Sequence, residues 1–148
     1  MGNKRFGYFK QKQSGDIGLF EFNKETFEEK GKNKFVQFYF NNIPYIMAGN
    51  NLFHRDIFKK SLEKLGIEYN TKRSHIGNKV PCEKGDFYKL SGAGDIKFHE
   101  DRLNFDGCSS EYMDTIPETN KEHLEDFFGK EKISEIRGFW KACFLVDF

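Results

Sequence analysis

Short stretches in which hydrophobic and polar residues alternate make up most of this chain, and turn-rich segments separate them. Residues 5–9 and 17–22 alternate in this way around Gln13-Ser14-Gly15-Asp16, which predicts a β-hairpin. Residues 34–40 predict a strand, and residues 44–48 predict its antiparallel return after an Asn41-Asn42 turn. Residues 23–33 are highly charged and fit either a short helix or a loop.

One segment has helical spacing instead. The apolar residues Phe53, Ile57, Phe58, Leu62 and Leu65 recur on one helical face. Gly66 is placed to end this helix, and Asn50 or Asn51 can cap its start. After the helix, we expect a short strand at residues 67–69 and an exposed, irregular segment over 70–84.

A second hairpin is expected near the middle of the chain. The cluster Gly92-Ala93-Gly94-Asp95-Ile96 opens it, residues 96–98 and 103–105 form its arms, and His99-Glu100-Asp101 supplies the turn. The loop that closes it, Gly107-Cys108-Ser109-Ser110-Glu111-Tyr112, is rich in small residues. Such a loop can turn successive N–H groups into a concave nest for an anion, although small residues at a hairpin end are also common without any ligand.

The C-terminal third predicts further mixed structure. A helix is expected to open at Thr115-Ile116-Pro117-Glu118, to bury Leu124, Phe127 and Phe128, and to end at Gly129. A short helical piece over 130–137 and a final strand over 139–148 follow. This order predicts an α+β fold: a single domain, 1–148, with a central antiparallel or mixed β-sheet flanked by two main helices. Within it, residues 1–33 are an N-terminal hairpin extension of a core over 34–148.

Composition narrows the possible partners. The 148 residues are enough for one hydrophobic core, and 18 Phe at a mean hydropathy of −0.74 mean that a few large side chains supply most of it. Lys and Arg number 24 against 23 Asp and Glu, which argues against nucleic acid and acidic membranes as partners. No apolar run is long enough to span a bilayer, and the N-terminus lacks a signal-peptide core. Three widely spaced cysteines fit a reducing, cytoplasmic location.

Several residues are candidates for chemistry. His54 borders the apolar helix face, where it is either a base or a surface histidine without a task. His75, His99 and His123 have weaker claims, since His99 fits a turn and His123 a solvated helix face. Cys108 is not expected to be a phosphatase nucleophile, because Asp114 stands where such enzymes need an arginine. No spacing of histidines and cysteines predicts a metal site.

Taken in order, four segments resemble the phosphohistidine phosphatase (Janus/Ocnus) family. Lys34-Phe35-Val36 resembles its first strand, and Phe53-His54-Arg55-Asp56-Ile57-Phe58 resembles its Tyr-His-x-Asp-Ile-Tyr segment. Gly92-Ala93-Gly94-Asp95-Ile96 is similar to its Gly-Gly-Gly-Arg-Ile, and residues 107–112 are similar to its Gly-x-Ser-x-x-Tyr phosphate loop. The resemblance covers residues 34 to about 128.

The resemblance implies removal of phosphate from a phosphorylated protein or a small phosphorylated ligand, without a cofactor or metal. It assigns His54 as the general base, which works best with a pKa close to neutral. It also assigns the phosphoryl group to Lys34 and to a loop of Gly107, Cys108, Ser109, Ser110 and Glu111.

Two acidic residues depart from the family pattern. Asp95 replaces a basic residue, and Glu111 replaces a small one, so both add negative charge where a phosphate would bind. The alternative is therefore a non-catalytic binding module on the same fold, which holds a phosphorylated ligand, a nucleotide or a protein partner.

Overall fold

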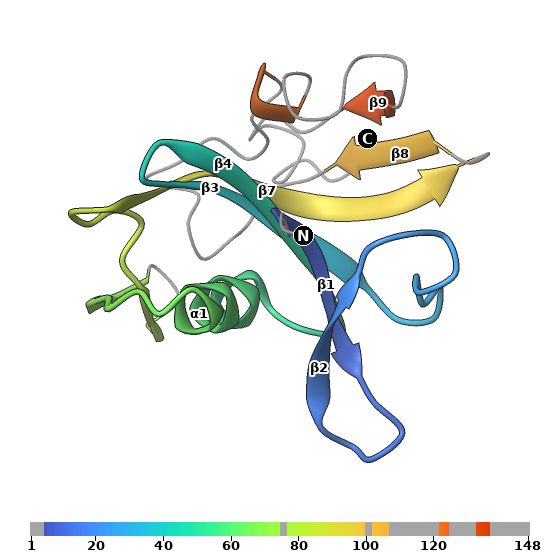
Figure 1. Cartoon of the computed structure of the whole chain (residues 1–148), viewed down its shortest axis with the longest axis horizontal. Helices are drawn as coiled ribbons and strands as arrows, with labels where there is room; N and C mark the ends of the chain where they lie inside the picture. Colours follow the sequence, from blue (N-terminus) through green and yellow to red (C-terminus); the bar gives the residue numbers. More distant parts are fainter. Residues whose placement is uncertain (1–4, 75–76, 100–101, 107–121, 125–132, 137–148) are drawn as a thin grey trace.

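A computed structural model describes residues 5–74, 77–99, 102–106, 122–124 and 133–136. Seven strands form one sheet in the order β2-β1-β4-β3-β7-β8-β9 (Figure 1). Their bounds are β1 (Phe6–Gln11), β2 (Ile17–Glu21), β3 (Asn33–Phe40), β4 (Ile43–Asn50), β7 (Tyr88–His99), β8 (Arg102–Asp106) and β9 (Ile133–Ile136). β1 pairs with β4, and β8 with β9, in parallel, whereas the other neighbours are antiparallel. The expected α+β fold with a central mixed sheet is confirmed.

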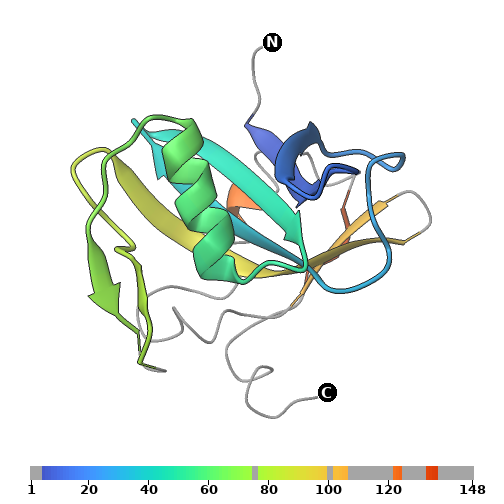
Figure 2. The same cartoon turned by 90° about the horizontal axis from the view of Figure 1, so that it is seen from below.

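Helical segments lie on both faces of this sheet. Helix α1 (His54–Lys64) covers one face, as Figure 2 shows, and a helical turn at 122–124 packs against the other face through Leu124. A two-stranded sheet of β5 (Thr71–Arg73) and β6 (Lys79–Pro81) lies beside α1. The strand side chains alternate between two hydrophobic layers, because successive residues of a strand point to opposite faces.

Large aromatic side chains fill both layers, as the composition predicts. In β1, Phe9 joins the α1 layer and Tyr8 joins the opposite one, and both are almost completely buried. In β3, Val36 faces α1, and Phe35 packs edge-on against Phe105 on the other face, with ring centroids 5.1 Å apart. The hydrophobic core thus lies on both sides of the sheet.

Several sequence predictions hold in detail. The hairpin of β1 and β2, the antiparallel pair of β3 and β4, and the hairpin of β7 and β8 all form. Helix α1 ends where expected, since Gly66 follows it with a φ of 71° and its N–H bonds to the Glu63 carbonyl. The N-terminal hairpin joins the central sheet directly, because β1 pairs with β4 along residues 6–9.

The helix cap and the 67–84 segment were predicted wrongly. Phe53 is the N-cap of α1 without a side-chain bond, because Asn51 instead accepts from the N–H of Lys32 in the preceding loop. Ile67 donates to the Leu62 carbonyl and packs beneath α1, so no strand forms at 67–69. Residues 70–84 are not all exposed or irregular, since β5 and β6 pair and bury Val80.

Three further predictions differ from the structure. The glycine cluster at 92–94 lies inside the single strand β7 instead of opening a hairpin. Part of the predicted helical piece at 130–137 is strand β9, because pairing with β8 overrides a weak local preference. His123 is 2% exposed and not solvated. The helix start at Thr115, the end of that helix at Phe127, Phe128 and Gly129, and the strand at 139–148 lie outside the described residues.

Candidate functional site

The His54 imidazole is buried at the first residue of α1. It is 3% exposed, and its Nε2 lies 2.9 Å from the carbonyl oxygen of Gly94 in β7. A carbonyl only accepts hydrogen bonds, so Nε2 carries the proton and donates it. In the neutral ring, the lone pair is therefore on Nδ1, which is the atom available to accept a proton.

The surroundings of His54 keep its ring neutral. The pKa of the imidazole is lowered from 6.5 to about 3, mainly by burial and in addition by the charge of Lys34, while the bond to the Gly94 carbonyl partly opposes both effects. This pKa lies well below the nearly neutral value at which a general base works best. An anion placed beside the ring would raise this pKa, because negative charge stabilises the imidazolium.

Lys34 lies on the face of the sheet that α1 covers. It precedes Val36 by two residues in β3, and Val36 packs in the α1 layer. Lys34 is half-buried, and its backbone pairs with Gly49 of β4 on one side and Asp95 of β7 on the other. Because directly paired residues share a face, the exposed Asp95 points to the same side as Lys34.

The start of α1 adds partial positive charge next to these groups. No side chain caps its N-terminus among the described residues, and the N–H of Asp56 bonds to the Phe53 carbonyl at 3.0 Å. The positive end of the helix dipole favours an anion there, although the acidic Asp56 in the first turn already offsets part of it. Arg55 lies over the ring of Phe53, with 4.6 Å from its guanidinium carbon to the ring centre. Phe53 itself is 55% exposed, so an apolar ring and a guanidinium flank the buried histidine.

Gly49 lets α1 lie this close to the sheet. A Cβ at Gly49 would be 2.9 Å from Leu52 Cδ1 and 3.0 Å from Ile57 Cγ1. These distances are shorter than van der Waals contact between carbon atoms. Gly49 of β4 pairs directly with Lys34 of β3. The residue that sets the distance between α1 and the sheet therefore also lies beside the candidate site. The sequence analysis missed this role, because a glycine inside a strand gives no sign of which element approaches it.

The predicted phosphate loop, Gly107, Cys108, Ser109, Ser110 and Glu111, lies outside the described residues. The strand before it is described, and its register is informative. Lys34 pairs with Asp95, and Asp95 pairs with Asp106, the last residue of β8. Neighbouring strands are ~4.8 Å apart, so the backbones of residues 34 and 106 are ~10 Å apart. Residue 107 follows at once in the chain.

Among the other histidines, the structure describes the side chain of His123, which has a different arrangement. His123 Nδ1 lies 2.9 Å from Ser91 Oγ, and its ring stacks on Tyr39 at 4.9 Å, which is a buried structural pair. His75 and the side chain of His99 lie outside the described part of the chain. Among the described residues, no group of three or more His, Cys, Asp or Glu side chains is arranged to hold a metal ion.

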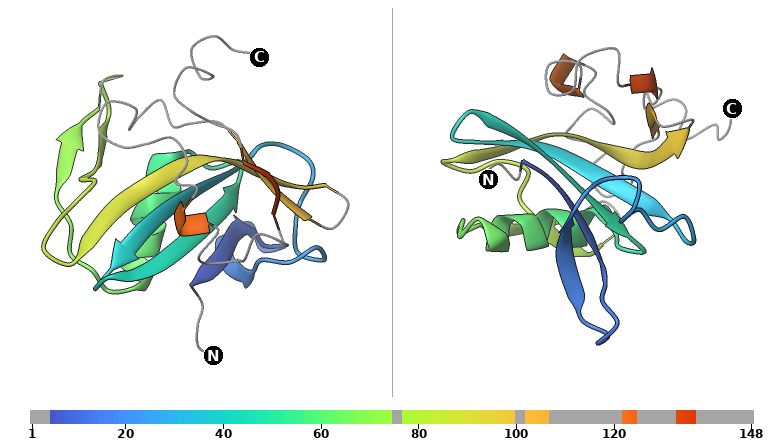
Figure 3. Two further views of the ribbon diagram at one scale, coloured as in Figure 1. Left: turned by 90° about the horizontal axis from the view of Figure 1, so that it is seen from above. Right: turned by 45° about the vertical axis from the view of Figure 1, so that its right-hand side comes forward.

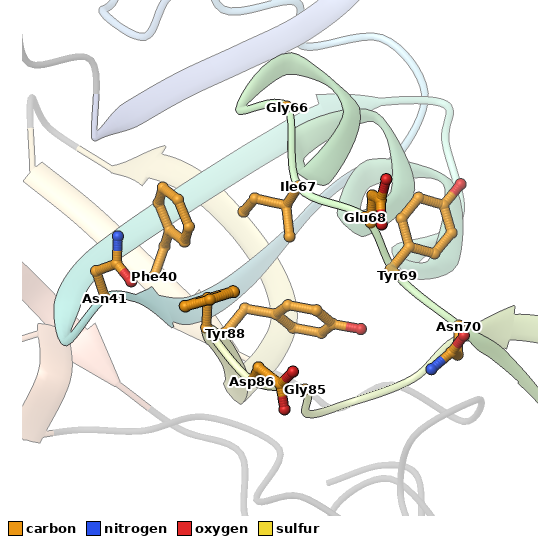
Figure 4. A pocket seen from close by; sticks show the side chains of 11 residues that line it. Phe40, Asn41, Gly66, Ile67, Glu68, Tyr69, Asn70, Gly85, Asp86 and Tyr88 are labelled. Atoms are coloured by element: carbon orange, nitrogen blue, oxygen red, sulfur yellow. The ribbon is translucent and has the colours of Figure 1, made fainter.

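A cavity of about 970 Å³ lies at the opposite end of α1 from His54 (Figure 4). It is lined by Phe40, Asn41 and residues 66–70 and 85–88. Its charged side chains among these residues are Glu68 and Asp86, which would repel a phosphate. Helix α1 has 11 residues, so ~16 Å separates this cavity from His54.

Comparison with family models, curated proteins and solved structures finds no match for this chain. Within the described residues, no helix has the length and apolar character needed to cross a bilayer.

Proposed function

We propose that this chain is a phosphohistidine-phosphatase-like hydrolase that removes phosphate from an N-phosphorylated substrate. His54 is the general base in this proposal, Lys34 neutralises phosphoryl charge, and the backbone N–H groups of residues 107–111 bind the phosphoryl oxygens. The observation that carries the proposal is the neutral His54 ring, fixed by the Gly94 carbonyl in the field of Lys34.

The chemistry needs a base but no metal. A water molecule attacks phosphorus, the new O–P bond forms, and the P–N bond breaks with its electron pair on the leaving nitrogen. His54 Nδ1 takes the proton of that water and returns it to the leaving nitrogen. The negative phosphoryl group raises the pKa of the ring when it binds, so the base strengthens once substrate is present.

The row of Lys34, Asp95 and Asp106 across three strands supports a shared site. It places the backbone of Asp106, the residue before the predicted phosphate loop, ~10 Å from the Lys34 backbone. Lys34 lies on the face that α1 covers, and His54 is the first residue of that helix.

One observation favours the alternative, a binding module without catalysis. The pKa of His54, about 3, makes the free ring a weak base, and Asp95 adds negative charge beside Lys34. A phosphorylated ligand would then be held but not hydrolysed.

Phosphate release from phosphoramidate and from a phosphohistidine peptide separates the two functions. His54→Gln is the sharpest variant, because the glutamine amide can still donate to the Gly94 carbonyl but has no basic nitrogen. We expect the variant to lose at least 100-fold in kcat/KM, in line with the usual contribution of a general base. Equal rates for the wild type and His54→Gln would remove His54 from the mechanism, and phosphate binding without turnover would leave the binding module.

Two charge-removing variants test whether the charge of Lys34 contributes to phosphate binding. Lys34→Met keeps a long side chain and removes the charge, whereas Lys64→Met makes the same change at an exposed position in the last turn of α1. The proposal expects weaker phosphate binding for Lys34→Met alone.

A further inference from the structure

The cavity beyond the last turn of α1 has a lining of aromatic and acidic side chains. Its volume of about 970 Å³ is in the range of small-molecule binding sites. Four of its eleven lining residues carry aromatic rings, and they are Phe40, Tyr69, Phe87 and Tyr88. The phosphate chemistry proposed for His54 does not involve this cavity, which lies ~16 Å away at the other end of the helix.

These rings come from separate parts of the chain that meet at one end of the large sheet. The turn between β3 and β4 lies beside the chain that leads into β7 (Figure 3), and the Asn41 N–H donates to the Phe87 carbonyl at 2.8 Å. Tyr69 belongs to the segment that follows α1. In Figure 4, the rings of Phe40, Tyr69 and Tyr88 reach the cavity from different sides. A ligand in the cavity would therefore contact rings from several elements.

Two buried residues, Tyr88 and Ile67, form the apolar floor of the cavity. The Tyr88 ring is 5% exposed and packs edge-on against Phe58, with ring centroids 5.9 Å apart. A Cβ at Gly85 would be 2.8 Å from Tyr88 Cε2, so a glycine is needed for the ring to lie this close to the loop. The Ile67 N–H donates to the Leu62 carbonyl at 2.9 Å, which holds Ile67 at the end of α1. The floor is thus preformed by the packing of the fold.

The charged side chains of the lining are both acidic. They are Glu68 and Asp86, which are exposed, and in Figure 4 they lie on either side of the Tyr88 ring. Lys84 and Lys89 are close to Asp86 in the sequence, but neither lines the cavity. The described lining therefore carries negative charge without a basic side chain, and this charge favours a cation.

The aromatic rings add to this preference. The face of an aromatic ring carries partial negative charge and attracts a cation that lies over it. The Tyr69 hydroxyl donates to Glu63 Oε2 at 3.1 Å. A phenol that donates to a carboxylate gains negative charge, so this bond strengthens the attraction of the Tyr69 ring for a cation. Carboxylates and ring faces thus select the same sign of charge.

The lining also distinguishes between kinds of cation. A metal ion needs several ligands, and in the described part of the chain no group of three or more His, Cys, Asp or Glu side chains is arranged to hold one. A primary ammonium is strongly hydrated and would lose water against the apolar floor. A quaternary ammonium has no N–H donor to satisfy, and its methyl groups can contact Ile67 and the ring faces.

We infer that this cavity binds a quaternary ammonium group. Tyr69 and Tyr88 contact its methyl groups. Glu68 and Asp86 balance its charge. Two sources present this chemistry: a small molecule such as choline, and a trimethylated lysine of a protein. The cavity is larger than the group itself, so it has room for the chain that carries the group. This inference is independent of the proposed phosphate chemistry.

A neutral isostere of choline tests whether the cavity recognises the charge. In neohexyl alcohol, a carbon atom replaces the nitrogen of choline, so the shape is kept and the charge is lost. NMR titration of the backbone amides gives the binding position and the Kd of each compound. We expect choline to shift the amides of residues 66–70 and 85–88, and the Kd of neohexyl alcohol to be roughly 10-fold higher or more. Equal Kd values, or choline shifts that do not saturate or that lie elsewhere, would overturn the inference.

Paired carboxylate variants test the source of the charge preference. Glu68→Gln/Asp86→Asn should raise the Kd of choline roughly 5-fold or more, whereas the control Asp16→Asn/Glu21→Gln changes the net charge equally at exposed positions of the N-terminal hairpin and should leave the Kd unchanged. The same rise in both variants would overturn the inference, because net charge alone would explain it. Hydrolysis of phosphoramidate should not change in either variant.

Two variants of Tyr69 separate the ring from its bond to Glu63. Tyr69→Phe keeps the ring and removes the bond, whereas Tyr69→Leu removes both. We expect the Kd of choline to rise roughly 2-fold in Tyr69→Phe and roughly 5-fold or more in Tyr69→Leu. An unchanged Kd in Tyr69→Leu, with amide signals elsewhere as in the wild type, would overturn the assignment of this ring to the site.

A pair of peptides distinguishes the two sources of the ligand. One peptide carries a trimethylated lysine, and the other carries the same lysine unmodified. A methylated peptide that binds more tightly than choline would assign the site to a protein side chain, and one that binds no more tightly would assign it to a small molecule. Equal Kd values for the two peptides would overturn the choice of a quaternary ammonium.

Discussion

Because the His54 ring is buried in its neutral form, the free energy of unfolding depends on pH. The pKa of the ring is about 3 in the folded protein, against 6.5 for an unperturbed histidine. Between these pH values the unfolded chain binds a proton that the folded chain does not, so stability falls as the pH drops from 6.5 toward 3. Each pH unit in this window costs ~1.4 kcal/mol, which gives a loss of roughly 3 kcal/mol by pH 4 from this group alone.

The matched measurement compares wild type with His54→Gln. Glutamine can keep the bond to the Gly94 carbonyl but does not titrate, and both proteins share every other ionisable group. Urea unfolding at pH 7, 6, 5 and 4 gives the free energy of unfolding of each. We expect the wild type to lose ~3 kcal/mol more than the variant between pH 7 and pH 4. Equal losses in the two proteins would refute the buried neutral ring.

Three further changes test the packing and hydrogen bonds of the folded protein. Gly49→Ala should cost ~1–3 kcal/mol in urea unfolding because its methyl group would lie 2.9 Å from Leu52 Cδ1 and 3.0 Å from Ile57 Cγ1, and adding Leu52→Val, which removes the closer atom, should recover part of that loss. Tyr8→Phe should cost ~1–2 kcal/mol in the same assay, because the buried hydroxyl donates to Asn33 Oδ1 at 2.5 Å and accepts from the Glu28 N–H at 3.0 Å. Asn104→Leu should raise Tm by a few degrees, since it removes a buried oxygen that accepts no hydrogen bond, and a lower Tm would contradict that assignment.

Local sequence patterns predict the helices and strands of this fold better than they predict which of these elements pair or pack together. Alternation and turn chemistry identify both hairpins, and helical spacing with Gly66 identifies α1. The errors arise where a distant element decides the local state. Residues 133–136 form a strand because β8 lies beside them, and Asn51 bonds to Lys32 instead of capping α1 because the preceding loop returns to it.

The candidate site shows the same difference between what local patterns predict and what long-range contacts decide. The sequence selects His54 and Lys34, and the structure brings them together. The low pKa of His54 depends on its burial against Gly94. A local pattern does not encode this property, because it is set by a contact between residues 40 positions apart in the chain.

A crystal structure with bound inorganic phosphate tests the central claim most directly. The predicted result is a phosphate in contact with Lys34 Nζ and the His54 ring on one side and with backbone N–H groups of residues 108–111 on the other. A structure with those N–H groups on the face of the sheet opposite α1, or with phosphate bound only elsewhere, would contradict it.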